Sequence, residues 1–300
     1  MAAGLSTCLA IISVGAFHEF FPHTTRGQAA GLATFGSITM AAQVDAGAEA
    51  VRSTPPSVSG EAMPVGDLAG WRQVFTDDFS SDVAVGDFPA QVTSNWRAYP
   101  SPAKDTSGHG TYSPQQVVSV SGGVLTNFIH TDNGGPKVAA IIPKLAGTSA
   151  NGVTYGRFAV RFRADSLPGY KIAWMLWPDS GNNAKDGEID FPEMNLDSPT
   201  MFGFMHHTNA TTTPDQAWVR ANVDITAWHT AVMEWSPGLV VYILDGAEIG
   251  RVTDRVPTTP MHWILQTETA LNPPATPAAT VQGNVQIDWV AAWAYNPTPG

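Results

Sequence analysis

Three acidic side chains stand close together in an otherwise apolar stretch of the chain. The segment Asp-Gly-Glu-Ile-Asp-Phe-Pro-Glu, residues 186–193, places Glu188, Asp190 and Glu193 within six residues of one another. Burying an unpaired carboxylate is costly or forces its protonation, so such a cluster is unusual in an apolar segment. Neighbouring carboxyl groups with separated pKa values perform general acid/base and glycosyl-transfer chemistry. The spacing therefore predicts a site for a reaction of that kind.

The geometry of the three acids follows from the periodicity of a β-strand. Alternate side chains share one face, so Glu188 and Asp190 point to one side and Ile189 to the other. Simple counting places Glu193 on the same side as Ile189. A β-bulge would return it to the side of the other acids, and Pro192, which has no N–H for the sheet ladder, suits such an irregularity. We therefore expect three acids in a row on one face of a sheet.

The pattern Glu-x-Asp-x-x-Glu on a strand resembles the active-site signature of glycoside hydrolase family 16, which includes laminarinases, lichenases, agarases and transglycosylases. Five further segments resemble strands of that family in the same order, over roughly residues 65 to 296: Trp71–Phe79, Tyr112–Leu125, Tyr155–Arg163, Trp228–Gly246 and Gln286–Tyr295. The resemblance implies a concanavalin A-like β-jelly roll with a concave groove for a sugar chain.

The pattern of short segments and turns independently favours an all-β fold with two sheets packed as a sandwich. Residues 158–163 alternate between apolar and polar side chains, and residues 240–244 end at Asp245-Gly246, a hairpin turn signal. Neither a long helical periodicity nor an internal repeat is apparent in the sequence. Such patterning is typical of β-sandwiches and jelly rolls.

Composition narrows the possible partners of the chain. Its formal net charge of −11 argues against nucleic acid, whose phosphates require a basic surface. The single cysteine, Cys8, excludes an internal disulfide and a metal site built from cysteine clusters. The charge says little about a neutral polysaccharide, which is the substrate class that the resemblance implies, and the protein is expected to be a monomer.

The N-terminal part of the chain reads as separate from the catalytic domain. Residues 1–44 are expected to be an export leader or a disordered N-terminus, because Arg26 precedes a small, apolar run at residues 29–42. Residues 45–64, rich in Ala, Ser, Pro and Gly, are expected to be a linker, and residues 65–300 the catalytic domain. The protein is thus predicted to be secreted or associated with the cell envelope, with membrane contact only through the leader.

The resemblance implies roles for the acids. Glu188 would be the nucleophile, Glu193 the general acid and then base, and Asp190 would tune their charge and hold Glu188. The implied activity is retaining endo-hydrolysis of a β-linked polysaccharide, most simply a β-1,3- or β-1,3-1,4-glucan, by double displacement and with no cofactor required for catalysis.

Three other readings stay open. A transglycosylase would use the same residues with a sugar acceptor in place of water. A carbohydrate-binding protein without activity would have no reason to hold three acids at this spacing. A metal-binding protein could use the acids as ligands, but no histidine partner on the same face is evident from the sequence.

Aromatic residues are candidates for stacking on sugar rings, whose C–H faces are apolar. Trp174 and Trp177 lie just before the acids, but their opposite parity on a strand means that at least one belongs to the core. Trp218 and Trp263 are further candidates. The run that contains Trp174 departs from the family's usual Trp-Pro-Ala-x-Trp, which leaves its register open.

Polar candidates lie further along the chain. The resemblance suggests that His206 borders the active site as a hydrogen-bonding residue. Gln266 and Glu268 share a face of a strand and are expected to contact sugar hydroxyls or to orient a catalytic acid. Asp288 matches a position that binds a structural Ca²⁺ in many family members, together with backbone oxygens near Gly123, and calcium prefers such oxygen ligands.

Overall fold

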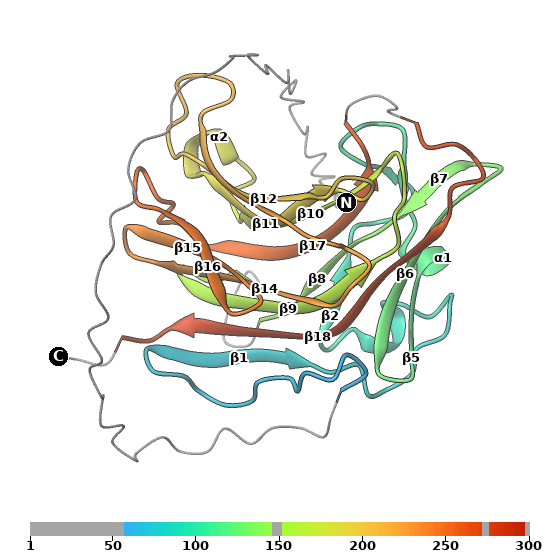
Figure 1. The fold of residues 1–300 in the computed structure, drawn as a ribbon, viewed down its shortest axis with the longest axis horizontal. Coiled ribbons are helices and arrows are strands. Elements are labelled where there is room, and N and C mark those ends of the chain that lie inside the picture. The colour runs from blue at the N-terminus through green and yellow to red at the C-terminus, as the bar shows by residue number, and fades with distance from the viewer. Residues whose placement is uncertain (1–56, 146–151, 272–275, 298–300) are drawn as a thin grey trace, which may run out of the picture.

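Two β-sheets face each other across the core of the computed structural model, which describes residues 57–145, 152–271 and 276–297. The sheet that contains β11 and β12 lies above the sheet that contains β9 and β18 in Figure 1. Within these described ranges, three short helical turns connect the strands: η1 (Ala90–Val92), α1 (Pro114–Val117) and α2 (Asn183–Asp186). The expected all-β jelly-roll sandwich is confirmed.

The front sheet carries the acidic segment. Within the described residues it has seven strands, in the order β13 (Gln216–Asn222), β12 (Thr200–His206), β11 (Glu188–Asn195), β10 (Tyr170–Pro178), β17 (Met261–Thr269), β8 (Ala140–Pro143) and β2 (Trp96–Ala98). All neighbours in this sheet are antiparallel. The acidic strand β11 is therefore flanked by β10 and β12.

The back sheet has eleven strands among the described residues. Its main path runs β16 (Ala247–Val252), β15 (Leu239–Leu244), β14 (His229–Ser236), β9 (Gly156–Ala164), β18 (Gly283–Tyr295), β6 (Val124–Asp132), β7 (Gly135–Val138), β4 (Thr111–Tyr112) and β3 (Ala103–Lys104). Strand β1 (Trp71–Asp77) pairs with β18, and β5 (Val118–Ser121) pairs with β6.

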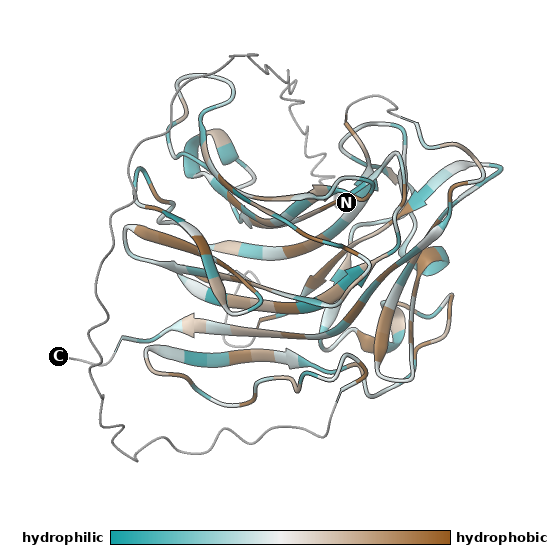
Figure 2. Cartoon of the chain, in the orientation of Figure 1, coloured by the Kyte–Doolittle hydropathy of each residue, from teal (hydrophilic) through white to brown (hydrophobic). Residues whose placement is uncertain are grey.

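The space between the sheets is filled by side chains that alternate along each strand. Figure 2 shows hydrophobic residues concentrated along the strands of both sheets. Trp174 of β10 contacts Phe162 of β9 edge-on at 4.7 Å between ring centroids, and Trp263 of β17 contacts Phe158 in the same way at 5.5 Å. Both tryptophans are fully buried. The expectation that Trp174 or Trp263 forms a platform for sugar is therefore wrong, because each ring fills the core between the sheets.

The segment before residue 65 is partly built into the domain, which corrects the expected linker 45–64. The Ser59 N–H and hydroxyl donate to the Asp288 carboxylate, the former at 3.2 Å. Glu61 pairs with Arg161 at 2.9 Å, and its carbonyl accepts from the Trp289 indole, also at 2.9 Å. Buried Met63 packs in a small hydrophobic cluster on β9, β14 and β18. Residues 57–64 thus belong to the sandwich.

The remaining N-terminal predictions concern residues 1–56, which lie outside the described residues. Among the residues that the structure describes, no helix is long and apolar enough to cross a membrane.

Candidate active site

The three acids lie on one face of β11, as their spacing predicts. Against β12, Asp190 pairs with Phe204 and Glu193 pairs with Phe202, so β11 advances three residues while β12 advances two. This irregularity is the expected β-bulge, which brings Glu193 back to the face of the other acids. Ile189, between two of the acids, is fully buried in the core.

Glu188 is buried and is held from the first residue of α2. Its Oε2 accepts a hydrogen bond of 2.9 Å from the Asn183 side-chain amide. The turn is stabilised by Asn182, whose side chain accepts from the backbone N–H of Lys185. Asn183 was not anticipated from the sequence, because nothing in its local pattern shows that a helical turn folds back on the strand that follows.

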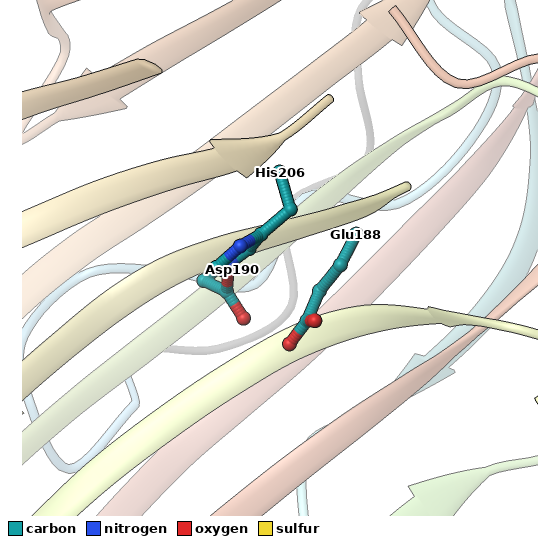
Figure 3. Close-up of side chains that lie close together, drawn as sticks. All are labelled: Glu188, Asp190 and His206. Carbon is teal, nitrogen blue, oxygen red and sulfur yellow. The ribbon is translucent and has the colours of Figure 1, made fainter. Parts of the chain in front are cut away.

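Asp190 is buried between Glu188 and His206. The nearest oxygen and nitrogen atoms of these three residues all lie within 4.8 Å of one another. In Figure 3 the carboxyl groups of Glu188 and Asp190 are neighbours, and the His206 ring reaches towards Asp190. The distance from His206 Nε2 to Asp190 Oδ2 is 3.4 Å. His206 therefore borders the acids, as the resemblance implies.

Charge in this cluster is balanced by the histidine. Burial raises the pKa of Asp190 well above its ordinary value and the charge of Glu188 raises it further, while His206 opposes both effects. Burial on its own would lower the pKa of His206, but Asp190 and the charge of Glu188 outweigh it and raise the pKa of His206 to about 9. His206 is accordingly an imidazolium at neutral pH.

The structure corrects one argument against a metal site. We expected no histidine on the same face as the acids, yet His206 stands opposite Glu188 in the register of β12 and β11. An imidazolium offers no lone pair to a metal ion, however, so this histidine in its protonated form acts as a counter-charge to the acids.

Glu193 contacts a lysine that the sequence analysis did not identify. The Lys171 ammonium on β10 lies 2.7 Å from Glu193 Oε1 and 4.0 Å from Glu268 Oε2. Burial alone would lower the pKa of Lys171, but the charges of Glu193 and Glu268 outweigh it, so the net effect is a raised pKa and a charged side chain. Glu193 keeps the most exposed side chain of the three acids, at 18%.

Glu268 lies behind Lys171 and is completely buried. Its Oε1 accepts hydrogen bonds from the Tyr112 hydroxyl at 2.6 Å and from the backbone N–H and hydroxyl of Thr106 at 3.0 and 2.5 Å. Of the two roles expected for Glu268, contact with sugar hydroxyls is therefore wrong, since no part of the side chain is accessible. Gln266 shares its face and is also buried, and its expected role, contact with sugar or orientation of a catalytic acid, stays a prediction.

Aromatic side chains flank the acids on the same face. Trp177 is half-buried at the far end of β10, opposite His262 of β17. On β12, Phe202 and Phe204 alternate with core residues and stack at 5.4 Å between centroids. Trp218 of the outer strand β13 is 54% exposed and packs edge-on against Phe202 at 6.2 Å. The role of Trp177 and Trp218 as sugar platforms stays a prediction, and the phenylalanine pair adds an apolar surface that we had not foreseen.

The expected calcium ligands lie at the opposite sheet, next to the N-terminal segment. One Asp288 oxygen is occupied by the two donors of Ser59, and the Arg161 guanidinium donates to the same Ser59 hydroxyl at 3.0 Å. A Cβ placed on Gly123 would lie 3.5 Å from the Val58 side chain, so the same segment passes both residues. The two hydrogen bonds of Ser59 thus satisfy one oxygen of Asp288. They add no support for calcium, which stays a prediction.

The sandwich and its row of acids are typical of glycosidases that act through paired carboxyl groups. A family model described as "Glycosyl hydrolases family 16" matches residues 144–291, a range that includes all three acids. The chain therefore carries a domain of glycoside hydrolase family 16, as the sequence pattern predicted.

Solved structures of this family have the same fold. A non-specific endo-beta-1,3(4)-glucanase named SCLam superposes with a TM-score of 0.62 at 20% identity, over 78% of this chain and 95% of that one. The laminarinase from Rhodothermus marinus has a TM-score of 0.60 at 22% identity, over 76% and 99% of the two chains. An endo-beta-1,3-glucanase from Pyrococcus furiosus has a TM-score of 0.59 at 15% identity, over 82% and 100%. The search of curated proteins returned no match.

Proposed function

We propose that this protein is a retaining endo-glycoside hydrolase that cleaves a β-1,3- or β-1,3-1,4-glucan. The observation that carries the proposal is the placement of Glu188, Asp190 and Glu193 on one face of β11, each with a different partner. Different surroundings give neighbouring carboxyl groups different pKa values and therefore different roles in catalysis. The glucan specificity rests on the similar solved structures, which are described as laminarinases and endo-beta-1,3(4)-glucanases.

The first chemical step uses two of the acids together. Glu188 attacks the anomeric carbon while the bond from that carbon to the glycosidic oxygen breaks, and the proton of Glu193 passes to the departing oxygen. The Asn183 amide fixes the orientation of Glu188, and the His206 cation offsets the negative charge that Glu188 and Asp190 concentrate in a buried place.

The second step returns the enzyme to its starting state. Glu193, now a carboxylate, takes a proton from water as the water oxygen attacks the same carbon and displaces Glu188. Two inversions at one carbon restore the β configuration of the product. A transglycosylase would follow the same course with a sugar hydroxyl in place of water.

One experiment tests both activity and substrate. The purified protein is incubated with laminarin, lichenan, agarose, carrageenan and xyloglucan, and the products are sized over time beside the Glu188→Gln variant. Rapid appearance of short oligosaccharides from laminarin or lichenan supports the proposal. Products longer than the starting chains would identify a transglycosylase, and activity only on agarose or carrageenan would refute the glucan specificity.

Three further properties are part of the proposal. Export rests on residues 1–44, whose sequence pattern is that of a leader. Sequencing the N-terminus of the mature protein tests it. The structural calcium at Asp288 rests on the resemblance to the family, and metal analysis of the purified protein tests it. The protein is further proposed to be a monomer, which light scattering tests.

A further inference from the structure

One lysine lies between two acidic side chains at the base of the candidate active site. Lys171 is 7% exposed at its side chain, and its ammonium group faces Glu193 on one side and Glu268 on the other. A buried lysine is unfavourable unless acids compensate its charge. Here the charge is retained, because the two acids together raise the pKa of Lys171 despite its burial.

Glu268 is arranged to hold the lysine rather than the substrate. All three donors that bind Glu268, from Tyr112 and Thr106, reach Oε1. Its Oε2 is buried, has no hydrogen-bond partner among the described residues, and lies 4.0 Å from the Lys171 ammonium. The three hydrogen bonds fix this carboxylate, and its free oxygen supplies a negative charge on the side of Lys171 away from Glu193.

The contact between Lys171 and Glu193 is specific to one oxygen. The ammonium donates to Oε1 at 2.7 Å, a short, charge-assisted hydrogen bond. A carboxylate oxygen that accepts a hydrogen bond from a cation has a low affinity for a proton. The proton that Glu193 needs as a general acid therefore resides on Oε2, the oxygen that Lys171 leaves free.

We propose that Lys171, held in place by Glu268, is a positioning residue that orients the Glu193 carboxyl group and stabilises it as an anion once its proton has been transferred. This inference rests on the proposed function, in which Glu193 is the acid and then the base. The proton goes to the leaving oxygen in the first step and is replaced from water in the second. Lys171 keeps its own proton throughout, so the charge balance of the cycle is unchanged.

The kinetic test compares Lys171→Met with wild type over a range of pH. Because the variant loses the cation that contacts the Glu193 carboxyl group, the basic limb of its kcat/KM profile should move to higher pH by about one unit or more. Hydrolysis of glucan, which needs protonation of a poor leaving group, should fall at least about 100-fold. An aryl glycoside with an activated leaving group should be affected much less. If the role of Lys171 were purely structural, its replacement would slow the hydrolysis of both substrates alike and leave the basic limb of the pH profile unmoved.

Two further variants sharpen the comparison. Glu268→Gln keeps the acceptor for Tyr112 and Thr106 but removes the charge that competes for Lys171, so its basic limb should move downwards, opposite to that of Lys171→Met. Lys104→Met removes the same charge from an exposed lysine of β3 and should leave the profile unchanged. Equal shifts in Lys104→Met and Lys171→Met would overturn the proposal.

A measurement that does not depend on activity separates this inference from the proposed function. In protein labelled with ¹³C at the glutamate carboxyl carbons, the Glu193 signal is assigned by its loss in Glu193→Gln and followed during a pH titration. Lys171→Met should move its midpoint upwards. If Lys171→Met fails to fold, the double variant with Glu268→Gln also removes the buried charge that would otherwise be left without a partner at residue 268, and it should still show a Glu193 midpoint above that of wild type. An unmoved midpoint refutes the role of Lys171, even in an active enzyme. A moved midpoint in a protein that cleaves none of the polysaccharides refutes the proposed function alone.

Discussion

Replacing His206 by glutamine should make the stability of the protein less dependent on pH. The pKa of His206 is raised from 6.5 to about 9 by Asp190 and the nearby acids, in spite of burial. A group with a raised pKa binds more protons in the folded than in the unfolded state between those two values. Its stabilisation is therefore complete below pH 6.5 and is lost as the pH rises through 9.

The size of the effect follows from the same shift. Each unit of pKa difference corresponds to about 1.4 kcal/mol, so the contribution of His206 that disappears over this interval is about 3 kcal/mol. Titrating groups that do not interact with His206 are common to both proteins and drop out of the comparison, whereas the pKa of Asp190, which His206 lowers, rises further in the variant. The difference in free energy of unfolding between wild type and His206→Gln should therefore shrink by about 3 kcal/mol between about pH 6 and about pH 10.

Urea unfolding of both proteins at several pH values measures this difference. His109→Gln, which changes an exposed histidine away from the acids, is the matched control and should show a difference that stays flat. A flat difference for His206→Gln as well would mean that His206 is not held as a cation by the acids, and the charge balance described for the site would be wrong.

Further changes probe the acids, the domain boundary and the groove. Glu188→Gln should lose nearly all turnover of glucan and aryl glycosides alike, whereas Glu193→Gln should slow glucan by about 100- to 10,000-fold and activated aryl glycosides far less; equal losses in steady-state assays would contradict the separate roles. A protein that begins at Ser57 should unfold at the same urea concentration as the full chain. One that begins at Val65 should unfold at a clearly lower concentration, because it loses the contacts of residues 57–64. Equal unfolding midpoints would mean that residues 57–64 are a linker after all. Trp218→Ala should raise KM for long glucans, and it should change stability little because the ring is half exposed. An unchanged KM would mean that Trp218 does not bind the glucan.

The acidic row could be predicted because it depends on local rules. Strand parity fixes the faces of Glu188 and Asp190, and the chemistry of Pro192 points to the bulge that realigns Glu193. Both features are properties of a few consecutive residues. Parity also showed that Trp174 and Trp177 face opposite ways, but which of them faces the core depends on the side of the sheet that the rest of the chain covers.

The parts that were missed depend on contacts between distant segments. Lys171 is 22 residues from Glu193 in sequence, and nothing in its surroundings indicates that β10 and β11 bring the two together. The segment at residues 57–64 resembled a linker because it contains few large apolar residues. It is held by hydrogen bonds and an ion pair from Ser59 and Glu61, whose partners lie about 100 to 230 residues away.

The stereochemistry of the reaction tests the central claim most directly. Proton NMR of a glucan digest, recorded within the first minutes and before mutarotation, identifies the anomer that the enzyme releases. Double displacement through Glu188 predicts that the β-anomer appears first and the α-anomer only later, at the rate of spontaneous mutarotation. Initial release of the α-anomer would mean a single displacement by water, and the assignment of Glu188 as nucleophile would be wrong.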